Sequence, residues 1–370
     1  MARLTNLQLF GIVFVIMFIT PYEIMAKLLA MIAGQHGWIT ILGSILPGLL
    51  LVWIYYYILV NSERPFPGAL EQYLGKFAGK ALGFVYIWAF LLVAVISLAI
   101  FANLFLSNVL PGMPISILMI FVILPAYYAL RTGLETTARV IELVLFAVIP
   151  WAVIILLLGL GSETDWSRLL PLSGLPPSDF ANGILLLTSY ASLMVVVLTL
   201  GHFCHNTGKL WKWMLSAYAF FIVTMLVVTV VPVVVYGPYL TAIQTFPIFN
   251  VARATNIAGF IRNIEIILVS VVIPGMFSIL AIFWFLTCYT AQQVFGLRNY
   301  RILLSPTAIM AGILAVLMIP NIHILFVTLH KILPWIYIAV FGFIPGILAL
   351  VIRIEKHIKM VEPGSTLNTK

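Results

Sequence analysis

Charge is what this sequence has least of. Of its 370 residues only 8% are charged, whereas 63% are hydrophobic. A soluble domain carries about a quarter charged residues, and a soluble fold of this length could not bury so much apolar surface, because more than half of any folded surface faces outward. The composition therefore excludes an ordinary soluble enzyme and a disordered protein, and it predicts a chain that crosses a membrane many times.

Cysteine and catalytic motifs are also scarce. Cys204 and Cys288 are the only cysteines, and their spacing indicates no disulfide framework. The stretch with His202, Cys204 and His205 has the composition of a metal site, but its place at the end of an apolar run favours a solvated helix end. No phosphate-binding loop, nucleophile elbow, zinc-binding helix or dinucleotide fingerprint is present. We therefore predict no enzymatic activity, no cofactor and no metal.

Long apolar runs dominate what remains. A membrane-spanning helix needs about 20 apolar residues, and ten runs of roughly this kind follow one another. They lie at about 7–33, 38–60, 81–107, 115–130, 136–160, 180–201, 213–236, 263–290, 303–320 and 328–352. We predict an all-α integral membrane protein with ten transmembrane helices in a single domain (1–370). Short extra helices are expected near 67–75 and after Pro247, and a short tail at 354–370.

The basic residues set the orientation. If the ten runs alternate in direction, fourteen of the nineteen Lys and Arg residues fall on one side and four on the other, with Lys27 inside the first run. Cytoplasmic loops carry such an excess, so both termini are predicted to be cytoplasmic. Because these charges lie in short loops rather than on one solvated face, nucleic acid is not expected as a partner.

Two charges lie within the first run. A charged side chain is costly in hydrocarbon, so it is a functional candidate by default. Glu23 and Lys27 are four residues apart, a spacing that lets them pair on one helix face. Either they neutralise each other near the outer water layer, or Glu23 lies at the rim of a ligand cavity and attracts an ammonium group.

Two further charge pairs open later runs. Arg139 with Glu142 and Arg262 with Glu265 each have the spacing Arg-x-x-Glu. Either pair alone is typical of membrane-interface anchoring. Their recurrence on opposite sides of the membrane suggests inverted internal symmetry, and it makes all four residues candidates for charge or coupling roles.

Polar residues interrupt two spans. Thr20 and Pro21 break the first run, and a hydroxyl cluster from Thr188 to Ser192 lies in the middle of the sixth. Such hydroxyls compete for backbone groups or join packed helices. Interrupted first helices in two five-helix halves, however, indicate a transporter-type binding site. The helix ends at such breaks would direct a positive dipole at a ligand carboxylate.

The order of several short motifs resembles a known family, the B subunits of spore germinant receptors, or GerAB-type endospore germination permeases. The resemblance covers essentially the whole chain. The motifs are Leu7-Gln8-Leu9-Phe10, Gly37-Trp38-Ile39, Phe66-Pro67 followed by Leu70 and Tyr73-Leu74-Gly75, Ala138-Arg139-Val140-Ile141-Glu142, Arg168-Leu169-Leu170-Pro171, and Phe246-Pro247 followed by Arg253 and Phe260-Ile261-Arg262-Asn263-Ile264-Glu265.

The resemblance implies a fold and a function. The family belongs to the amino acid–polyamine–organocation superfamily, with a leucine-transporter architecture of two inverted five-helix repeats, here about 7–160 and 180–353. Its members are taken to recognise a small nutrient germinant, often an amino acid, in the inner membrane of the dormant spore. They act with a larger A subunit and a lipoprotein C subunit.

Carried onto this chain, the family's ligand site joins the first and sixth spans. The implied residues are Ile19, Thr20, Pro21 and Tyr22, facing Ser189, Tyr190, Ala191 and Ser192.

The chain departs from the family in two places. Relatives have a Gly-rich stretch before the proline of the first span, whereas no glycine lies between Gly11 and Gly34, and Val272 replaces an expected tryptophan. Either Pro21 alone opens the helix, or the ligand is not held through its carboxylate in the usual way.

Two other functions stay open. A secondary amino acid transporter would couple to protons, or to sodium held by hydroxyls such as Ser270 or Ser278. A structural subunit without a ligand is the third reading.

Overall fold

The computed structural model describes residues 4–161, 164–204, 207–254 and 265–361. These residues are organised in helices, and the β-type pairing found among them is one isolated bridge between Leu4 and Cys204. Eight stretches of the described chain are long and apolar enough to cross a membrane, and one of them joins the end of the first helix to the second.

Ten long helices or helix series follow one another in the described chain and match the ten predicted runs. Eight of them are single helices: α1 (Asn6–Ala33), α2 (Gly37–Asn61), α4 (Lys76–Asn108), α5 (Ile115–Thr132), α6 (Leu134–Leu158), α9 (Leu210–Tyr236), α12 (Glu265–Phe295) and α13 (Leu304–Met318). The sixth span is a series of α7 (Pro177–Ala191), η3 (Ser192–Val196) and α8 (Val197–Leu200). The tenth span is a series of α14 (Ile322–Val327), η7 (Thr328–Ile332), α15 (Leu333–Tyr337), η8 (Ile338–Phe343) and α16 (Ile344–Val361).

Short helices join these spans. They are η1 (Gly34–His36), α3 (Gly68–Leu74), η2 (Trp166–Leu169), η4 (Gly201–Phe203), η5 (Thr207–Lys209), α10 (Pro238–Ile243), α11 (Pro247–Ala254) and η6 (Tyr300–Leu303). The predicted short helices near 67–75 and after Pro247 are therefore confirmed as α3 and α11.

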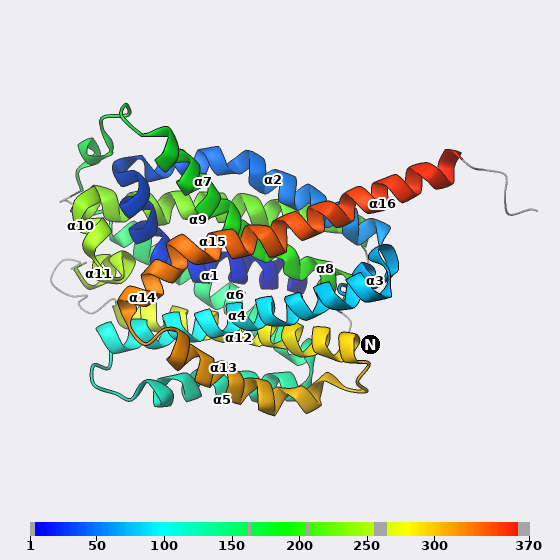
Figure 1. Cartoon of the computed structure of the whole chain (residues 1–370). Coiled ribbons are helices and arrows are strands. Elements are labelled where there is room, and N and C mark those ends of the chain that lie inside the picture. Colours follow the sequence, from blue (N-terminus) through cyan, green and yellow to red (C-terminus); the bar gives the residue numbers. More distant parts are fainter. Residues whose placement is uncertain (1–3, 162–163, 205–206, 255–264, 362–370) are drawn as a thin grey trace, which may run out of the picture.

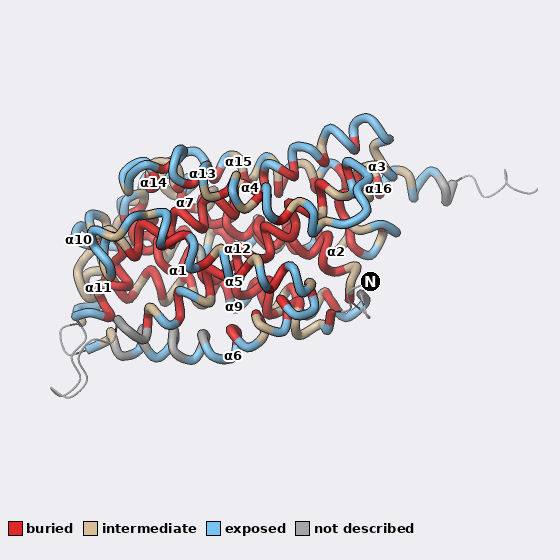
Figure 2. The backbone as a smooth tube through the Cα atoms, turned by 90° about the horizontal axis from the view of Figure 1, so that it is seen from below, coloured by how far each residue is buried: buried red, intermediate tan, exposed pale blue. Residues whose placement is uncertain are grey.

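The long helices run along a common direction, with α10 and α11 at one end and both the start of α1 and the end of α16 at the other (Figure 1). α16 continues as a helix through Val361, so the predicted tail is helical where it is described. Buried residues fill the middle of the bundle (Figure 2). Large apolar side chains such as Leu46, Phe121 and Ile309 are exposed on its outside, where a bilayer would cover them.

The first helix begins with a capping box. The Thr5 hydroxyl accepts a hydrogen bond from the backbone N–H of Gln8, whose side chain accepts one from the N–H of Thr5. This reciprocal pair satisfies two backbone donors that the first turn would leave free. From there α1 runs without a break through Pro21, so the predicted interruption at Thr20 and Pro21 is wrong, and with it the alternative in which Pro21 opens the helix. Proline is tolerated inside transmembrane helices because neighbours stabilise the freed backbone.

The sixth and tenth spans are irregular. In the sixth, α7 passes at Ser192 into the tighter 3₁₀ turns of η3, which confirms the predicted interruption. In the tenth, η7 and η8 are wider π-type turns. A 3₁₀ stretch inside a helix often marks a hinge or strain, and π-type turns are frequent at functional sites.

Candidate functional site

The hydroxyls of the sixth span shape its break. The Ser189 hydroxyl donates to the carbonyl of Leu186, and the Ser192 hydroxyl donates to the carbonyl of Ser189, both at 2.6 Å. A hydroxyl that bonds its own preceding turn competes with the helical hydrogen bonds and bends the helix. Ser189 and Ser192 therefore hold the irregular backbone, and their protons are not free for a ligand in this conformation.

Tyr55 of α2 connects the two irregular spans. Its hydroxyl lies 3.1 Å from the carbonyl oxygen of Ser192 and 2.6 Å from that of Phe341 in η8. Tyr86 of α4 donates to the adjacent carbonyl, that of Val340, at 2.6 Å. Two buried hydroxyls thus satisfy carbonyls at the points where regular helix is lost.

Sequence reasoning missed both tyrosines. The available signal was a tyrosine inside an apolar run, since a buried phenol hydroxyl usually has a partner.

On the sixth span, Tyr190 keeps a free polar atom. Its hydroxyl is buried and has no hydrogen-bond partner. Its ring meets that of Tyr337 in α15 edge to face, with centroids 6.1 Å apart. Ala191, the next residue, is also buried. Tyr190 is therefore the predicted sixth-span residue whose side chain is still available to a ligand.

On the first span, the predicted residues divide between faces of α1. α1 contacts α7 and η3, so the structure brings together the two predicted elements. Ile19 packs against α12, where a Cβ on Gly275 would lie 2.5 Å from its Cδ1. The Tyr22 ring packs on Phe18, with centroids 4.9 Å apart, and its hydroxyl is buried without a partner. Pro21 lies within the helix, and the side chain of Thr20 lies outside the described part.

Glu23 and Lys27 do not form the ion pair that their spacing suggested. Glu23 is 0% exposed, and neither of its carboxyl oxygens has a hydrogen-bond partner. Lys27 Nζ instead donates to three carbonyls at the end of α10, those of Ala242, Ile243 and Gln244, at 3.0, 3.2 and 2.8 Å. A cation at a helix C-terminus satisfies its unpaired carbonyls and complements its dipole.

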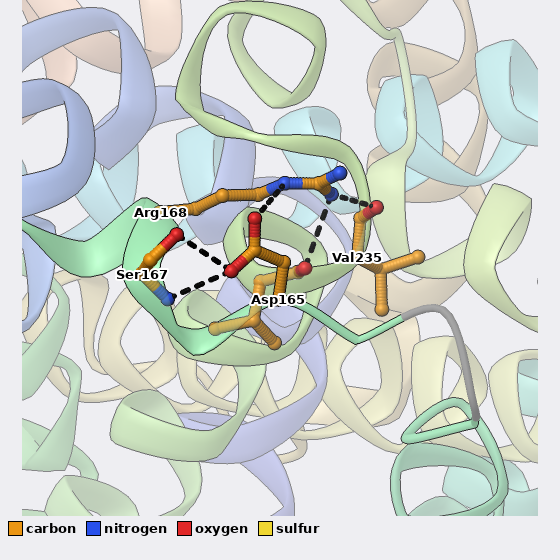
Figure 3. A network of polar contacts seen from close by, with 5 residues as sticks. Asp165, Ser167, Arg168 and Val235 are labelled. Atoms are coloured by element: carbon orange, nitrogen blue, oxygen red, sulfur yellow. Dashed lines mark hydrogen bonds and ion pairs between the residues drawn. The ribbon is translucent and has the colours of Figure 1, made fainter.

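Two arginines at the same end of the molecule cap helices in the same way. Arg168 donates from Nη1 to the carbonyls of Val234 and Val235 at the end of α9 (Figure 3). Arg253 donates to the carbonyl of Asn108 at the end of α4, at 2.9 Å. Basic residues on the side predicted to carry few Lys and Arg thus donate to carbonyls at helix ends.

Asp165 orients the Arg168 side chain that caps α9. The two side chains lie 3.6 Å apart, and Ser167 donates to the carboxylate from its hydroxyl and its backbone N–H (Figure 3). These hydrogen bonds from Ser167, with a smaller contribution from the Arg168 charge, lower the pKa of Asp165 below its ordinary value.

The opposite end is closed by backbone contacts. The N–H of Leu4 donates to the carbonyl of Phe203 at 2.9 Å, and the N–H of Phe66 donates to that of Leu198 at 3.3 Å. The Thr199 hydroxyl returns a bond to the Phe66 carbonyl at 2.9 Å. Leu4 is therefore tied to η4, and the segment before α3 is tied to α8.

The Arg-x-x-Glu residues have separate surroundings. Glu142 accepts a hydrogen bond from Gln8 Nε2 at 3.0 Å, which ties α6 to the first turn of α1. Arg139 is exposed. Arg262 and the side chain of Glu265 lie outside the described residues.

Metal ligands do not gather in the described chain, where no three His, Cys, Asp or Glu residues form a cluster that could hold an ion. His202 instead lies 3.3 Å from the Ser62 hydroxyl. His205 is outside the described residues.

Known structures share this fold. MhsT in complex with L-phenylalanine superposes with a TM-score of 0.63 at 12% identity, covering 95% of this chain and 99% of that one. A Na⁺-coupled sialic acid symporter gives 0.63 at 12% identity, with 97% and 90% covered. A nucleobase-cation-symport-1 family transporter gives 0.62 at 13%, with 94% and 78% covered. The predicted leucine-transporter-like fold is therefore confirmed.

Sequence comparison shows the family. Spore germination protein KB of Bacillus subtilis (strain 168) is 24% identical over 327 residues, which cover 86% of each chain. Residues 3–321 match the family described as "Spore germination protein". The proteins it resembles are permeases and transporters rather than enzymes. This chain is a multi-pass integral membrane protein, and it belongs to the spore germination protein family.

Proposed function

We propose that the chain is the nutrient-sensing subunit of a spore germinant receptor and that it binds a small molecule, an amino acid, between α1 and the break of the sixth span. The observation that carries the proposal is Glu23, a fully buried carboxyl without a hydrogen-bond partner in a transporter fold. Burying a polar group without a partner costs roughly 1–3 kcal/mol in proteins, so a fold that keeps one has a use for it.

The free polar atoms indicate how such a ligand is held. Glu23 would receive the ammonium group, and the unpartnered hydroxyls of Tyr22 and Tyr190 would contribute on adjacent helices. Because α1 is continuous through Pro21, it offers no helix end to a carboxylate. The arrangement supports the reading in which the first span holds the ligand by its amine.

Sensing requires two states that the ligand distinguishes. In the described conformation Lys27 is bonded to α10 at one end of the bundle, and Leu4 and Phe66 are bonded to η4 and α8 at the other; we take this as the closed state. A ligand that binds a more open state would shift the population toward it, and inverting a 1:99 ratio needs a difference in affinity of ~10⁴.

Partners and location complete the proposal. The receptor would pass this shift to an A-type subunit and a lipoprotein C-type subunit in the spore inner membrane, with both termini cytoplasmic. The start of α1 and the end of α16 do lie at one end of the bundle (Figure 1). Repeats at about 7–160 and 180–353 would supply the two halves that move.

Ligand-induced stabilisation tests the site. The purified protein is melted with each of the twenty amino acids, as wild type, as Glu23→Gln and as Glu142→Gln, a matched change on α6. A ligand at 100 times its dissociation constant stabilises by about 2.7 kcal/mol. We expect one or a few amino acids to do so for wild type and Glu142→Gln, with an affinity at least tenfold weaker for Glu23→Gln. Equal affinity in all three proteins would contradict the assignment.

Secondary transport is the second candidate. A buried carboxyl is the kind of group that proton coupling uses, and Glu23 is fully buried, although it lies past the middle of its span, toward the end where Lys27 is bonded to α10.

A further inference from the structure

A cavity opens on the outside of the bundle between the end of α2 and the start of α9. Its volume is about 360 Å³, which is within the usual range of ligand pockets. Asn61, the last residue of α2, and Lys212, in the first turn of α9, both line it. Since Trp213 of the same turn packs on Phe10 of α1, with ring centroids 5.6 Å apart, the cavity lies at the end of the bundle where α1 begins.

Aromatic side chains of both helices line the cavity. Trp53 and Tyr57 of α2 stack with ring centroids 5.4 Å apart, and the ring of Tyr56 lies 5.3 Å from that of Trp211 in α9. Trp and Tyr collect at the membrane–water interface, because their rings are apolar and their N–H or O–H groups are polar. The cavity therefore lies at the level of the lipid headgroups.

The lining of the cavity changes in character along α2. Trp53, an exposed apolar ring, and Asn61 are eight residues apart, which is about 12 Å along a helix. The polar residues Asn61 and Lys212 are at the end of the bundle, and Trp53 is farther toward its middle. An occupant that fills the cavity therefore extends from the headgroup level toward the hydrocarbon, as an amphiphile does and a small ion does not.

Several lining residues carry hydrogen-bond donors without acceptors. Lys212 is exposed and has no hydrogen bond or ion pair within the described chain. The hydroxyls of Tyr56 and Tyr57 and the indole N–H of Trp211 also have no partner there, and none of these three groups is fully buried. A matching occupant therefore brings acceptor oxygens.

Further positive charge surrounds the cavity. Lys356 of α16 donates to Oδ1 of Asn61, and Lys209 of η5 is exposed. None of the described residues that line the cavity is acidic, and Glu63 and Glu355, which are near it along the chain, lie outside its wall. A basic pocket between transmembrane helices favours an anionic headgroup, whereas these lysines would repel the ammonium group of a zwitterionic one.

We propose that this cavity binds one anionic phospholipid. The phosphate of its headgroup is held by Lys212 and by the hydroxyls of Tyr56 and Tyr57, and its acyl chains continue along Trp53 into the hydrocarbon. A free phosphate ion would match the charge, but it would leave the aromatic wall uncovered.

A lipid in this cavity would contact both predicted repeats. α2 belongs to the first and α9 to the second, and the contact between Tyr56 and Trp211 joins them. The lipid would therefore stabilise the described arrangement of these helices. The cavity is separate from the proposed amino acid site, because Glu23 lies toward the opposite end of the bundle, where Lys27 is bonded to α10.

Lipid titration of the full chain tests the site. The purified protein in a neutral detergent is melted with increasing amounts of short-chain phosphatidylglycerol, and the rise in melting temperature gives the dissociation constant. Phosphatidylcholine with the same chains tests the headgroup, and glycerol phosphate tests a soluble anion. Lys212→Gln removes the charge, with Lys80→Gln at an exposed position of α4 as its matched control. Tyr57→Phe removes a hydroxyl but keeps the ring, with the exposed Tyr128→Phe in α5 as its control.

For wild type we expect saturable stabilisation by phosphatidylglycerol, with an affinity at least about tenfold higher than for phosphatidylcholine. Lys212→Gln should weaken the binding about fivefold, the contribution of one basic residue near an anionic surface. Tyr57→Phe should weaken it at least about threefold, because it loses a hydrogen bond to a charged group. Lys80→Gln and Tyr128→Phe should bind as wild type does.

Four results would overturn the proposal. The first is the absence of saturable stabilisation by phosphatidylglycerol. The second and third are equal affinity for phosphatidylcholine, which would show that the headgroup charge is not recognised, and equal affinity for glycerol phosphate, which would show a site for a soluble anion. The fourth is an equal loss in Lys212→Gln and Lys80→Gln, which would show only the general attraction of an anion to a basic surface.

Two controls keep the result interpretable. Neither Lys212 nor Tyr57 is buried, so both variants are expected to fold, and their melting temperatures without lipid check this. Amino acid binding is measured on the same protein without added lipid, so a lipid site that fails leaves the receptor function standing.

Discussion

At the scale of the residue, the polar groups inside this bundle fall into two classes. Tyr55, Tyr86 and Lys27 are committed, because each donates to backbone carbonyls of another helix. Glu23 and Tyr190 are uncommitted and buried. The first class stabilises the described conformation, and the polar atoms of the second class are free to hydrogen-bond a ligand.

Tyr55→Phe removes the shared hydrogen bond between the sixth and tenth spans. It leaves the Ser192 and Phe341 carbonyls buried without this donor, so we expect the free energy of unfolding to fall by about 1–3 kcal/mol. Denaturation in detergent measures it. Tyr128→Phe, at an exposed residue, should change nothing, and equal losses in both variants would show that Tyr55 has no such role.

Lys27→Met keeps the apolar stem but removes all three hydrogen bonds to α10. The amides of α10 open locally before the bundle unfolds, so we expect their hydrogen exchange to speed up at least tenfold. Exchange in η2, which Arg168 holds independently, is the internal control. If α10 exchanges at the wild-type rate, Lys27 does not close this end.

At the scale of the element, close approaches fix how the helices pack. A Cβ on Gly48 of α2 would lie 2.0 Å from the hydroxyl oxygen of Tyr218 in α9, and that hydroxyl donates to the carbonyl of Ser44 at 3.0 Å. α2 and α9 can therefore meet as they do only with glycine at this position.

Gly48→Ala should disturb this contact. The added methyl group displaces the Tyr218 ring and its hydrogen bond, so we expect a loss of about 1–3 kcal/mol in the free energy of unfolding. Gly312→Ala, in an open part of α13, should stay within about 0.5 kcal/mol of wild type. A Gly48→Ala protein as stable as Gly312→Ala would contradict the packing.

The elements also show what sequence can predict. The ten spans were predictable because each apolar run has about the length of a bilayer crossing, and the break at Ser192 because its hydroxyls compete for the backbone. The unbroken helix at Pro21 was not predictable from the sequence, because packing against other helices, such as that of Ile19 on Gly275, decides whether a proline opens a helix. Likewise, Lys27 satisfies carbonyls more than 200 residues away in sequence, which no local spacing reveals.

At the scale of the whole molecule, a transporter fold with an unpaired buried carboxyl could either sense a nutrient or carry it across the membrane. Both activities use the same site and the same two-state scaffold. They differ in whether the chain alone completes a cycle that delivers the ligand to the other side.

Uptake by the chain alone tests this central claim most directly. The protein is reconstituted into vesicles with a proton or a sodium gradient, and the amino acid that stabilises it in a Glu23-dependent manner is supplied with a radiolabel. We predict saturable binding that Glu23→Gln weakens, and no accumulation above that of protein-free vesicles under either gradient. Accumulation driven by a gradient and abolished by Glu23→Gln would contradict the account and show a secondary transporter.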